Sequence, residues 1–154
     1  MYRSGRIRID LTPSRCDTTE LAAVTDRLPD FNIAVVDDDR RILESLKNLL
    51  ESADHAVRLF ASATALLESG CLAEIDCLIS DISMPAMDGL ELLRVVHATR
   101  PGLPIILITG HPELLNRLSS IDAGYYRWFK KPFNGQELLT AVSDSLRSSA
   151  RRKP

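Results

Sequence analysis

The sequence predicts an α/β fold, a doubly wound sheet of five parallel strands with helices on both faces. Short β-rich runs alternate five times with segments whose apolar residues recur at helical spacing, from about residue 31 to about residue 147. One run, residues 105–109, is apolar almost throughout, which is typical of a strand buried on both faces. Strands that alternate with helices in one domain pair in parallel, through right-handed crossovers.

The first two strand and helix units cover the region before residue 71. Residues 32–36 form a β-rich run that ends at an acidic triplet, residues 37–39. Apolar residues then recur at helical spacing over residues 42–52. Residues 56–60 are the second expected strand. The second helix is expected within residues 62–70, because this stretch starts with a serine that can cap a helix and ends with glycine.

The third unit places a carboxylate at the end of a strand. The apolar run 77–79 leads to Asp81, and the Met-Pro pair at 84–85 bars a continuous helix because proline fixes φ and lacks a donor. Asp88 can cap a helix over residues 89–97. In doubly wound sheets, ligands bind outside the carboxyl ends of the strands. A lone aspartate at such a place is usually a cap or a turn former, so its neighbours decide its role.

The last two units follow a loop that contains prolines and a glycine, residues 101–104. Residues 105–109 form the buried strand described above. A proline suits the first turn of a fourth helix, expected over residues 112–123. The aromatic run 125–129 is the fifth strand, and an asparagine can cap a last helix over residues 134–146.

The flavodoxin-like strand order 2-1-3-4-5 is the natural choice for this number of strands. With that order the first and third strands are neighbours, and the fourth lies beside the third. Their carboxyl ends would therefore converge. The residues at or just past these ends are Asp37, Asp38, Asp81, Thr109 and Lys131.

Three carboxylates gathered at one edge of a sheet repel one another unless a cation or protons offset their charge. Carboxylate oxygens, with a backbone carbonyl such as that of Ser83, suit magnesium. A lysine ammonium and a threonine hydroxyl nearby can hold phosphoryl oxygens, and a carboxylate can act as a nucleophile toward phosphorus. The pattern therefore predicts a Mg²⁺ site that handles a phosphoryl group.

Four motifs occur in a characteristic order and spacing: VVDDD at 35–39, ISDISMPAMDG at 79–89, LITGH at 107–111 and FKKPF at 129–133. Together they resemble a response regulator receiver domain over roughly residues 31–146. The TGH run is most similar to receivers of the nitrogen-fixation regulator type.

The resemblance implies a role for each of the acidic residues. Asp81 would be the phosphoacceptor, which takes a phosphoryl group from the phosphohistidine of a sensor kinase or of a phosphotransfer protein. Asp38 would be the main ligand of Mg²⁺, Asp37 would act through bound water, and the Ser83 carbonyl would complete the metal site. Asp39 is expected only to cap the first helix.

The resemblance also implies residues that contact or control the phosphoryl group. Thr109 would hydrogen-bond it, and Lys131, directly before Pro132 in an expected cis peptide bond, would pair with it in preference to the adjacent Lys130. Gly110 would leave the group open to approach. The positions that would modulate dephosphorylation are Ser83 and His111.

Trp128 departs from the family pattern. The family usually has tyrosine or phenylalanine three residues before the lysine, as a rotamer switch coupled to Thr109. The larger indole can hinder inward rotation. Alternatively, Trp128 is an exposed aromatic residue on a partner face. Both interpretations stay open.

Composition sets limits on the class of protein. The net charge of -2 and pI near 5.9 give no basic field, so direct nucleic-acid binding is not expected. Three cysteines without metal spacing favour a reducing compartment, the cytoplasm. No apolar stretch is long enough to span a bilayer, and the amino terminus lacks the apolar core of a secretory signal, so no membrane association is expected.

Both ends of the chain differ from the domain at 31–147. Residues 1–30 read as an extension with a capping-box pattern at Asp17 and Glu20, compatible with a short helix, dimer contacts or disorder. Residues 148–154 read as a flexible basic tail. No output domain is expected on the chain.

We therefore expect a signalling switch rather than an enzyme with an external substrate. Phosphorylation of Asp81 would reshape the face made by the fourth helix, fifth strand and fifth helix, where an unknown partner or a second copy would bind. One alternative is a vestigial domain that acts as an interaction module without phosphorylation. The other is a magnesium-dependent phosphohydrolase, although such enzymes of the haloacid dehalogenase type place an aspartate where Ser83 lies.

Overall fold

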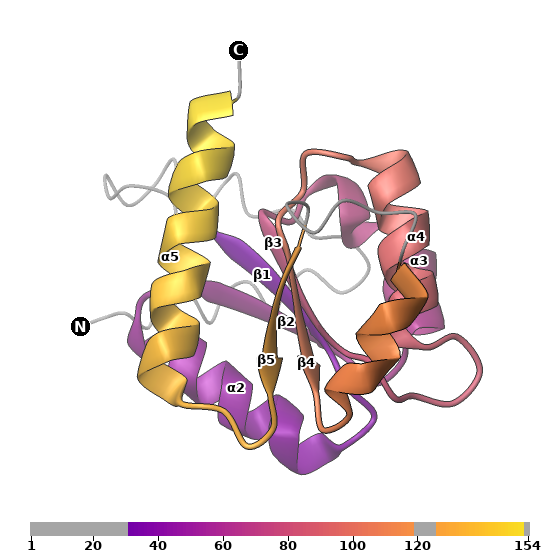
Figure 1. The fold of residues 1–154 in the computed structure, drawn as a ribbon. Helices are drawn as coiled ribbons and strands as arrows, with labels where there is room; N and C mark the ends of the chain where they lie inside the picture. The colour runs from indigo at the N-terminus through magenta and orange to yellow at the C-terminus, as the bar shows by residue number, and fades with distance from the viewer. Residues whose placement is uncertain (1–30, 119–125, 153–154) are drawn as a thin grey trace.

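In the computed structural model, which describes residues 31–118 and 126–152, the strands form one parallel sheet in the order β2-β1-β3-β4-β5 (Figure 1). The strands are β1 (Asn32–Val36), β2 (Ala56–Phe60), β3 (Cys77–Asp81), β4 (Ile105–Thr109) and β5 (Tyr126–Lys130). The predicted fold class and strand order are confirmed. All neighbouring pairs are parallel, so every strand ends at the same edge of the sheet.

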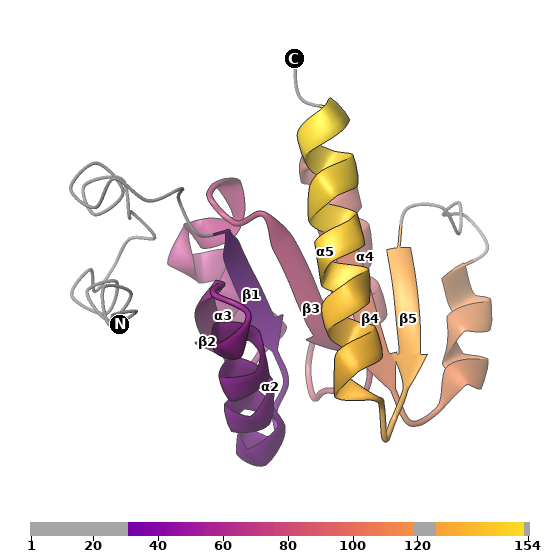
Figure 2. The same ribbon diagram turned by 90° about the vertical axis from the view of Figure 1, so that its left-hand side faces the viewer.

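Helices cover both faces of the sheet, with α2 and α5 on one face and α3, α4 and η3 on the other (Figures 1 and 2). Their bounds are α2 (Arg40–Ser52), α3 (Ala63–Ser69), α4 (Gly89–Thr99) and α5 (Gly135–Arg152), with short 3₁₀ helices η2 (Cys71–Ala73) and η3 (Pro112–Leu118). Alternate strand residues point to opposite faces, so the sheet builds two apolar cores. Every residue of the central strands β3 and β4 is buried, as the apolar run of residues 105–109 predicted.

Side-chain caps start the helices at the predicted residues. Asp39, Ser62 and Asn134 each accept a hydrogen bond from a backbone N–H in the first turn of α2, α3 and α5. Asp88 and Glu91 form a capping box at the start of α4. These caps satisfy N–H groups that have no partner within the helix.

Two elements differ from the sequence-based expectation. A helix was predicted over residues 112–123, but the described part is the 3₁₀ helix η3, whose first turn closes with an i+3 bond from Leu114 N to His111 O. The tighter turn accompanies burial of Leu118 at the end of η3 against the core. The remainder of that prediction, and Tyr125 at the expected start of β5, lie outside the described residues.

The last helix is longer than predicted. α5 continues to Arg152, through residues expected to form a tail, and its end extends beyond the sheet (Figure 2). Between Gly135 and Pro154 the sequence has no residue that breaks a helix. Basic residues near the carboxyl end of a helix also stabilise it, because they interact favourably with the helix dipole.

The expectations for residues 1–30, including a short helix there, lie outside the described residues. Within the described part of the chain, none of the helices combines the length and apolarity that crossing a membrane needs.

Candidate functional site

The carboxyl edge of the sheet brings the predicted residues together. Asp37 directly follows β1, Asp81 is the last residue of β3, Thr109 is the last residue of β4, and Lys131 directly follows β5. Because the strands are parallel and in register at this edge, the ends of β1, β3, β4 and β5 lie side by side. This is the convergence that the predicted strand order requires.

Three carboxylates form the centre of the site. One potential ligand oxygen from each of Asp37, Asp38 and Asp81 lies within 4.8 Å of the others. Asp37 and Asp81 are buried, with 2% and 7% of their surface exposed, whereas Asp38 is exposed. Of the three carboxylates, Asp38 is therefore the one that is accessible to solvent.

Lys131 is the cation of the site. Its Nζ lies 3.3 Å from Asp37 Oδ2 and 3.3 Å from Asp81 Oδ1, so it bridges the two buried carboxylates. The neighbouring Lys130 is exposed. The Lys131–Pro132 peptide bond is cis, as the resemblance implied. The two lysines therefore have different surroundings, and Lys131 is the one at the carboxylates.

The charges at the site are only partly compensated. Burial raises the pKa of Asp81, the neighbouring Asp37 raises it further, and Lys131 opposes both effects. Burial also raises the pKa of Asp37, against a hydrogen bond from the Asp39 N–H and the attraction of Lys131. Burial alone would lower the pKa of Lys131, but Asp81 and Asp37 outweigh it, so that pKa is raised. One ammonium thus leaves excess negative charge on the pair.

This donor set fits magnesium. Carboxylate oxygens are hard ligands, and a divalent cation would offset the charge that Lys131 leaves uncompensated. Magnesium keeps several waters and therefore needs few protein ligands, which agrees with a cluster open on the side of Asp38. Ser83, whose carbonyl was predicted as a further ligand, is exposed in the loop after β3, and its role stays a prediction.

Thr109 is fully buried, and its Oγ1 accepts a hydrogen bond of 2.8 Å from the backbone N–H of His111. The Thr109 carbonyl accepts another, also of 2.8 Å, from the N–H of Lys131. His111 itself is an exposed residue at the rim, with Nδ1 3.6 Å from Glu113 Oε2. The turn after β4 is therefore tied to both Thr109 and Lys131.

Two glycines near the site differ in their surroundings, and the close packing of Gly89 was not predicted from the sequence. The role expected of Gly110 stays a prediction. A Cβ added at Gly110 would meet nothing within 4 Å, but a Cβ at Gly89 would lie 2.2 Å from the backbone oxygen of Asp81. Gly89 N also donates to Ile82 O at 2.9 Å, which closes the loop between β3 and α4. The sequence does carry a signal for this close approach, because glycine stands at the first position of a helix, where a residue with a higher helix propensity is usually favoured.

Trp128 lies on β5 and is 44% exposed. Its indole is thus outside the core in this structure. The two interpretations of Trp128, as a hindered rotamer switch and as part of a partner face, stay predictions.

A family model and several known proteins match most of this chain. The model of a family described as the response regulator receiver domain matches residues 33–143. The chain is 37% identical over 121 residues to the response regulator protein TmoT of Ectopseudomonas mendocina, covering 79% of this chain and 55% of that protein. It is 36% identical over 118 residues to the transcriptional regulatory protein FixJ of Azorhizobium caulinodans, covering 77% of this chain and 56% of that protein. The chain thus spans about half the length of these curated relatives.

Solved structures agree with this match. A CheY-like receiver domain protein from Methanospirillum hungatei superposes with a TM-score of 0.73 at 32% identity, covering 81% of this chain and all of that one (100%). The response regulator StyR gives a TM-score of 0.72 at 36% identity, covering 80% of this chain and 63% of that chain.

Proposed function

The chain belongs to the response regulator receiver domain family, and from this premise we propose that Asp81 is its phosphoacceptor. The observation that carries the proposal is the pair of 3.3 Å contacts by which Lys131 joins Asp81 to Asp37 at the carboxyl edge of the sheet. The donor is the phosphohistidine of a sensor histidine kinase or of a phosphotransfer protein. The chain acts as a signalling phosphoacceptor that catalyses only its own phosphorylation and dephosphorylation.

The chemistry uses residues that already face one another. One carboxylate oxygen of Asp81 attacks the phosphorus, the bond from phosphorus to the imidazole nitrogen of the donor breaks, and its electron pair stays on that nitrogen. Lys131 holds positive charge beside Asp81, where the phosphoryl oxygens arrive. Thr109 supplies a hydroxyl for one of these oxygens. Gly110 leaves the approach open.

Asp38 and Asp81, with Asp37 through water and the carbonyl of Ser83, would hold magnesium, whose charge offsets that of the phosphoryl oxygens. The raised pKa values of Asp37 and Asp81 support this assignment, because burial, their main cause, deprives the ionised carboxylates of solvation that a bound cation would replace. Ser83 and His111, both exposed near the acceptor, are the residues that set access of water for dephosphorylation.

The output is a change in the face formed by η3, β5 and α5, coupled to Thr109 through the turn that follows β4. The exposed indole of Trp128 on β5 supplies an apolar contact on this face, which suits a protein partner or a second copy of the chain. The net charge of -2 does not favour nucleic acid as the direct partner.

The proposal is tested by phosphorylation with acetyl phosphate and Mg²⁺, followed by intact-mass analysis. Wild type should gain one phosphoryl adduct, and Asp81→Asn should gain none. Asp39→Asn is the matched control, because asparagine retains the helix cap and Asp39 lies outside the carboxylate cluster. An adduct in Asp81→Asn, or none in wild type, would refute the proposal and favour an interaction module that works without phosphorylation.

Trp128 provides an optical readout on the same samples. A saturable change in its emission with beryllium fluoride, dependent on Mg²⁺ and absent in Asp81→Asn, would link the tryptophan to switching. An adduct without a change in emission would mean that Trp128 takes no part in the switch.

A further inference from the structure

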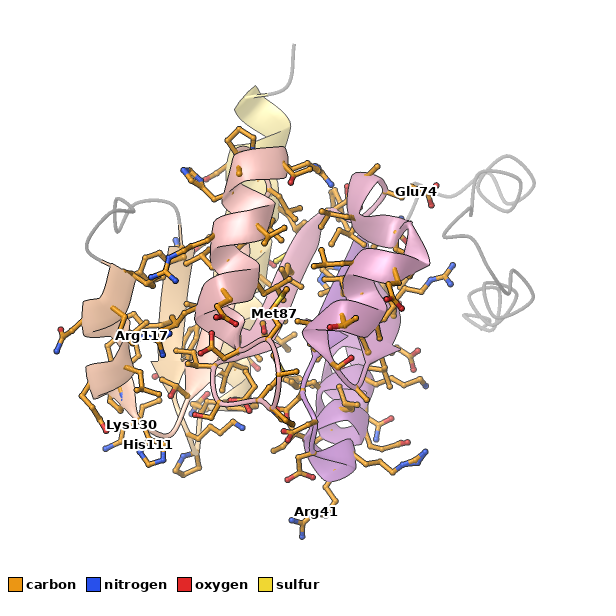
Figure 3. The ribbon with its side chains drawn as sticks, turned by 90° about the vertical axis from the view of Figure 1, so that its right-hand side faces the viewer. Arg41, Glu74, Met87, His111, Arg117 and Lys130 are labelled. Atoms are coloured by element: carbon orange, nitrogen blue, oxygen red, sulfur yellow. The ribbon has the colours of Figure 1, made fainter. Side chains whose placement is uncertain are left out.

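Arg117 connects two segments that flank the site. It lies in η3, and its Nη1 is 3.3 Å from Asp88 Oδ2 at the start of α4. In return, Arg94 Nη2 of α4 donates a hydrogen bond of 2.8 Å to the backbone oxygen of Arg117. In Figure 3, Arg117 lies beside the first turn of α4, and Met87 lies in the loop that enters this helix. We call these contacts the η3–α4 brace.

One end of the brace reaches the loop after Asp81. Asp88 is the cap of α4, and its Oδ1 accepts hydrogen bonds from the N–H groups of Leu90 and Glu91. The next residue, Gly89, donates to Ile82 O and lies against the carbonyl of Asp81. A displacement of Asp88 would therefore also displace the loop that follows Asp81.

The other end of the brace reaches Thr109. The N–H of His111, one residue before η3, donates to Thr109 Oγ1 at 2.8 Å, and Leu118 at the end of η3 is buried in the core. The segment between these two anchors carries Arg117. The brace thus ties the loop after β3 to the turn after β4.

We propose that Arg117 is a positioning residue that, through Asp88 and Arg94, holds the loop after β3 and the turn after β4 in the arrangement of the unphosphorylated domain. This inference rests on the proposed phosphoacceptor function. In that function, η3 shifts when Thr109 engages the phosphoryl group, so contacts between η3 and α4 belong to the resting arrangement. A contact made only in the resting state weakens binding of any ligand that favours the other state.

The expected effect is modest, because the ion pair is partly exposed: the side chains of Arg117 and Asp88 are 47% and 22% exposed. Loss of such a pair should strengthen binding of beryllium fluoride, an analogue of the phosphoryl group, by about two- to five-fold.

The experiment compares four proteins with wild type by titration of beryllium fluoride in excess Mg²⁺. Arg117→Gln removes the positive charge of the ion pair. Asp88→Asn removes its negative charge, while asparagine still caps α4. The double variant tests whether both changes act through one contact. Lys47→Gln is the control, because it removes an ion pair of similar length, 3.2 Å to Glu51, within α2 alone.

Each single variant should lower the beryllium fluoride concentration at half-saturation, the midpoint, by the same factor. The double variant should lower it no further, and Lys47→Gln should have the midpoint of wild type. Unchanged midpoints, additive effects or an equal change in Lys47→Gln would overturn the inference and leave the phosphoacceptor function intact. Weaker binding in Arg117→Gln, with a thermal melt that shows a folded protein, would also overturn it. If wild type itself fails to bind the analogue at Asp81, the proposed function falls, and the role of Arg117 falls with it.

Discussion

The ammonium nitrogen of Lys131 lies 3.3 Å from a carboxylate oxygen of Asp81, although Lys131 follows β5 and Asp81 ends β3, two strands that are not neighbours in the sheet. Lys131 reaches across the end of β4 and also meets Asp37 at 3.3 Å. A single cation is thus shared by two buried anions, and their raised pKa values show that burial outweighs the attraction of that cation. The ionised forms of these two carboxylates therefore cost stability, and a bound cation would offset that cost.

Asp81→Asn should stabilise the metal-free protein. The folded state raises the pKa of Asp81 through burial and the charge of Asp37, so its ionised form destabilises the fold near neutral pH. A neutral amide of the same shape removes that cost, and the melting temperature in EDTA should rise by about 2–6 °C. Circular dichroism provides the measurement. Asp39→Asn should give no rise, because a hydrogen bond from the Arg41 N–H lowers the pKa of Asp39; a lower melting temperature in Asp81→Asn would contradict the argument.

The stability of the metal-free protein should fall as the pH rises above the ordinary carboxyl value of 3.8. In the window between that value and the raised pKa values of Asp37 and Asp81, the folded state holds protons that the unfolded state has released. Stability therefore decreases with pH across the window. Urea midpoints between about pH 4 and about pH 7 measure this slope. Asp81→Asn should flatten it, and saturating Mg²⁺ should reduce or reverse it; an unchanged slope with Mg²⁺ would argue against a metal at these carboxylates.

Lys131→Met should have opposite effects on two ligands. Removal of the ammonium that contacts Asp37 and Asp81 removes repulsion of a metal ion, so Mg²⁺ should bind about two- to ten-fold more tightly. Beryllium fluoride should bind about ten-fold more weakly or worse, because a charge-assisted contact is lost. Calorimetric titrations measure both affinities. Lys130→Met is the matched control, since Lys130 is adjacent and exposed. A change of the same sign for both ligands would show that Lys131 acts on the fold and not on charge.

Much of this site was accessible from the sequence, because parallel strands bring their carboxyl ends to one edge. Strand order and the position of each aspartate then suffice to gather Asp37, Asp38 and Asp81, and the caps at Asp39 and Asp88 follow from local chemistry. The 3₁₀ form of η3 did not follow, since it depends on how the turn after β4 meets the core.

Contacts between distant segments were equally out of reach. Arg117 and Asp88 are 29 residues apart, and no periodic pattern relates them. The approach of Gly89 to the Asp81 carbonyl depends on how closely the first turn of α4 packs on β3. The pattern of side chains along the sequence does not encode that distance. The sequence therefore predicts which residues reach the edge of the sheet, and tertiary packing decides how their loops are held.

Gly89→Ala provides the sharpest test of that packing. The added Cβ would lie 2.2 Å from the Asp81 backbone oxygen and 2.8 Å from Ile82 Cα, and both atoms are main chain, so neither can move aside without shifting the loop or the strand end. Alanine is otherwise the better helix former, so propensity alone predicts a gain. We expect instead a loss of about 2 kcal/mol or more in the free energy of unfolding, measured with urea.

Gly110→Ala is the control for this prediction, because its Cβ would meet nothing within 4 Å, and its stability should lie within about 0.5 kcal/mol of wild type. A displaced Asp81 should also bind Mg²⁺ more weakly in Gly89→Ala. If Gly89→Ala is as stable as wild type, the start of α4 does not press on Asp81, and this contact does not couple the helix to the acceptor carboxylate. If it is destabilised but retains full Mg²⁺ affinity, the clash is relieved within α4, and the end of β3 holds its place.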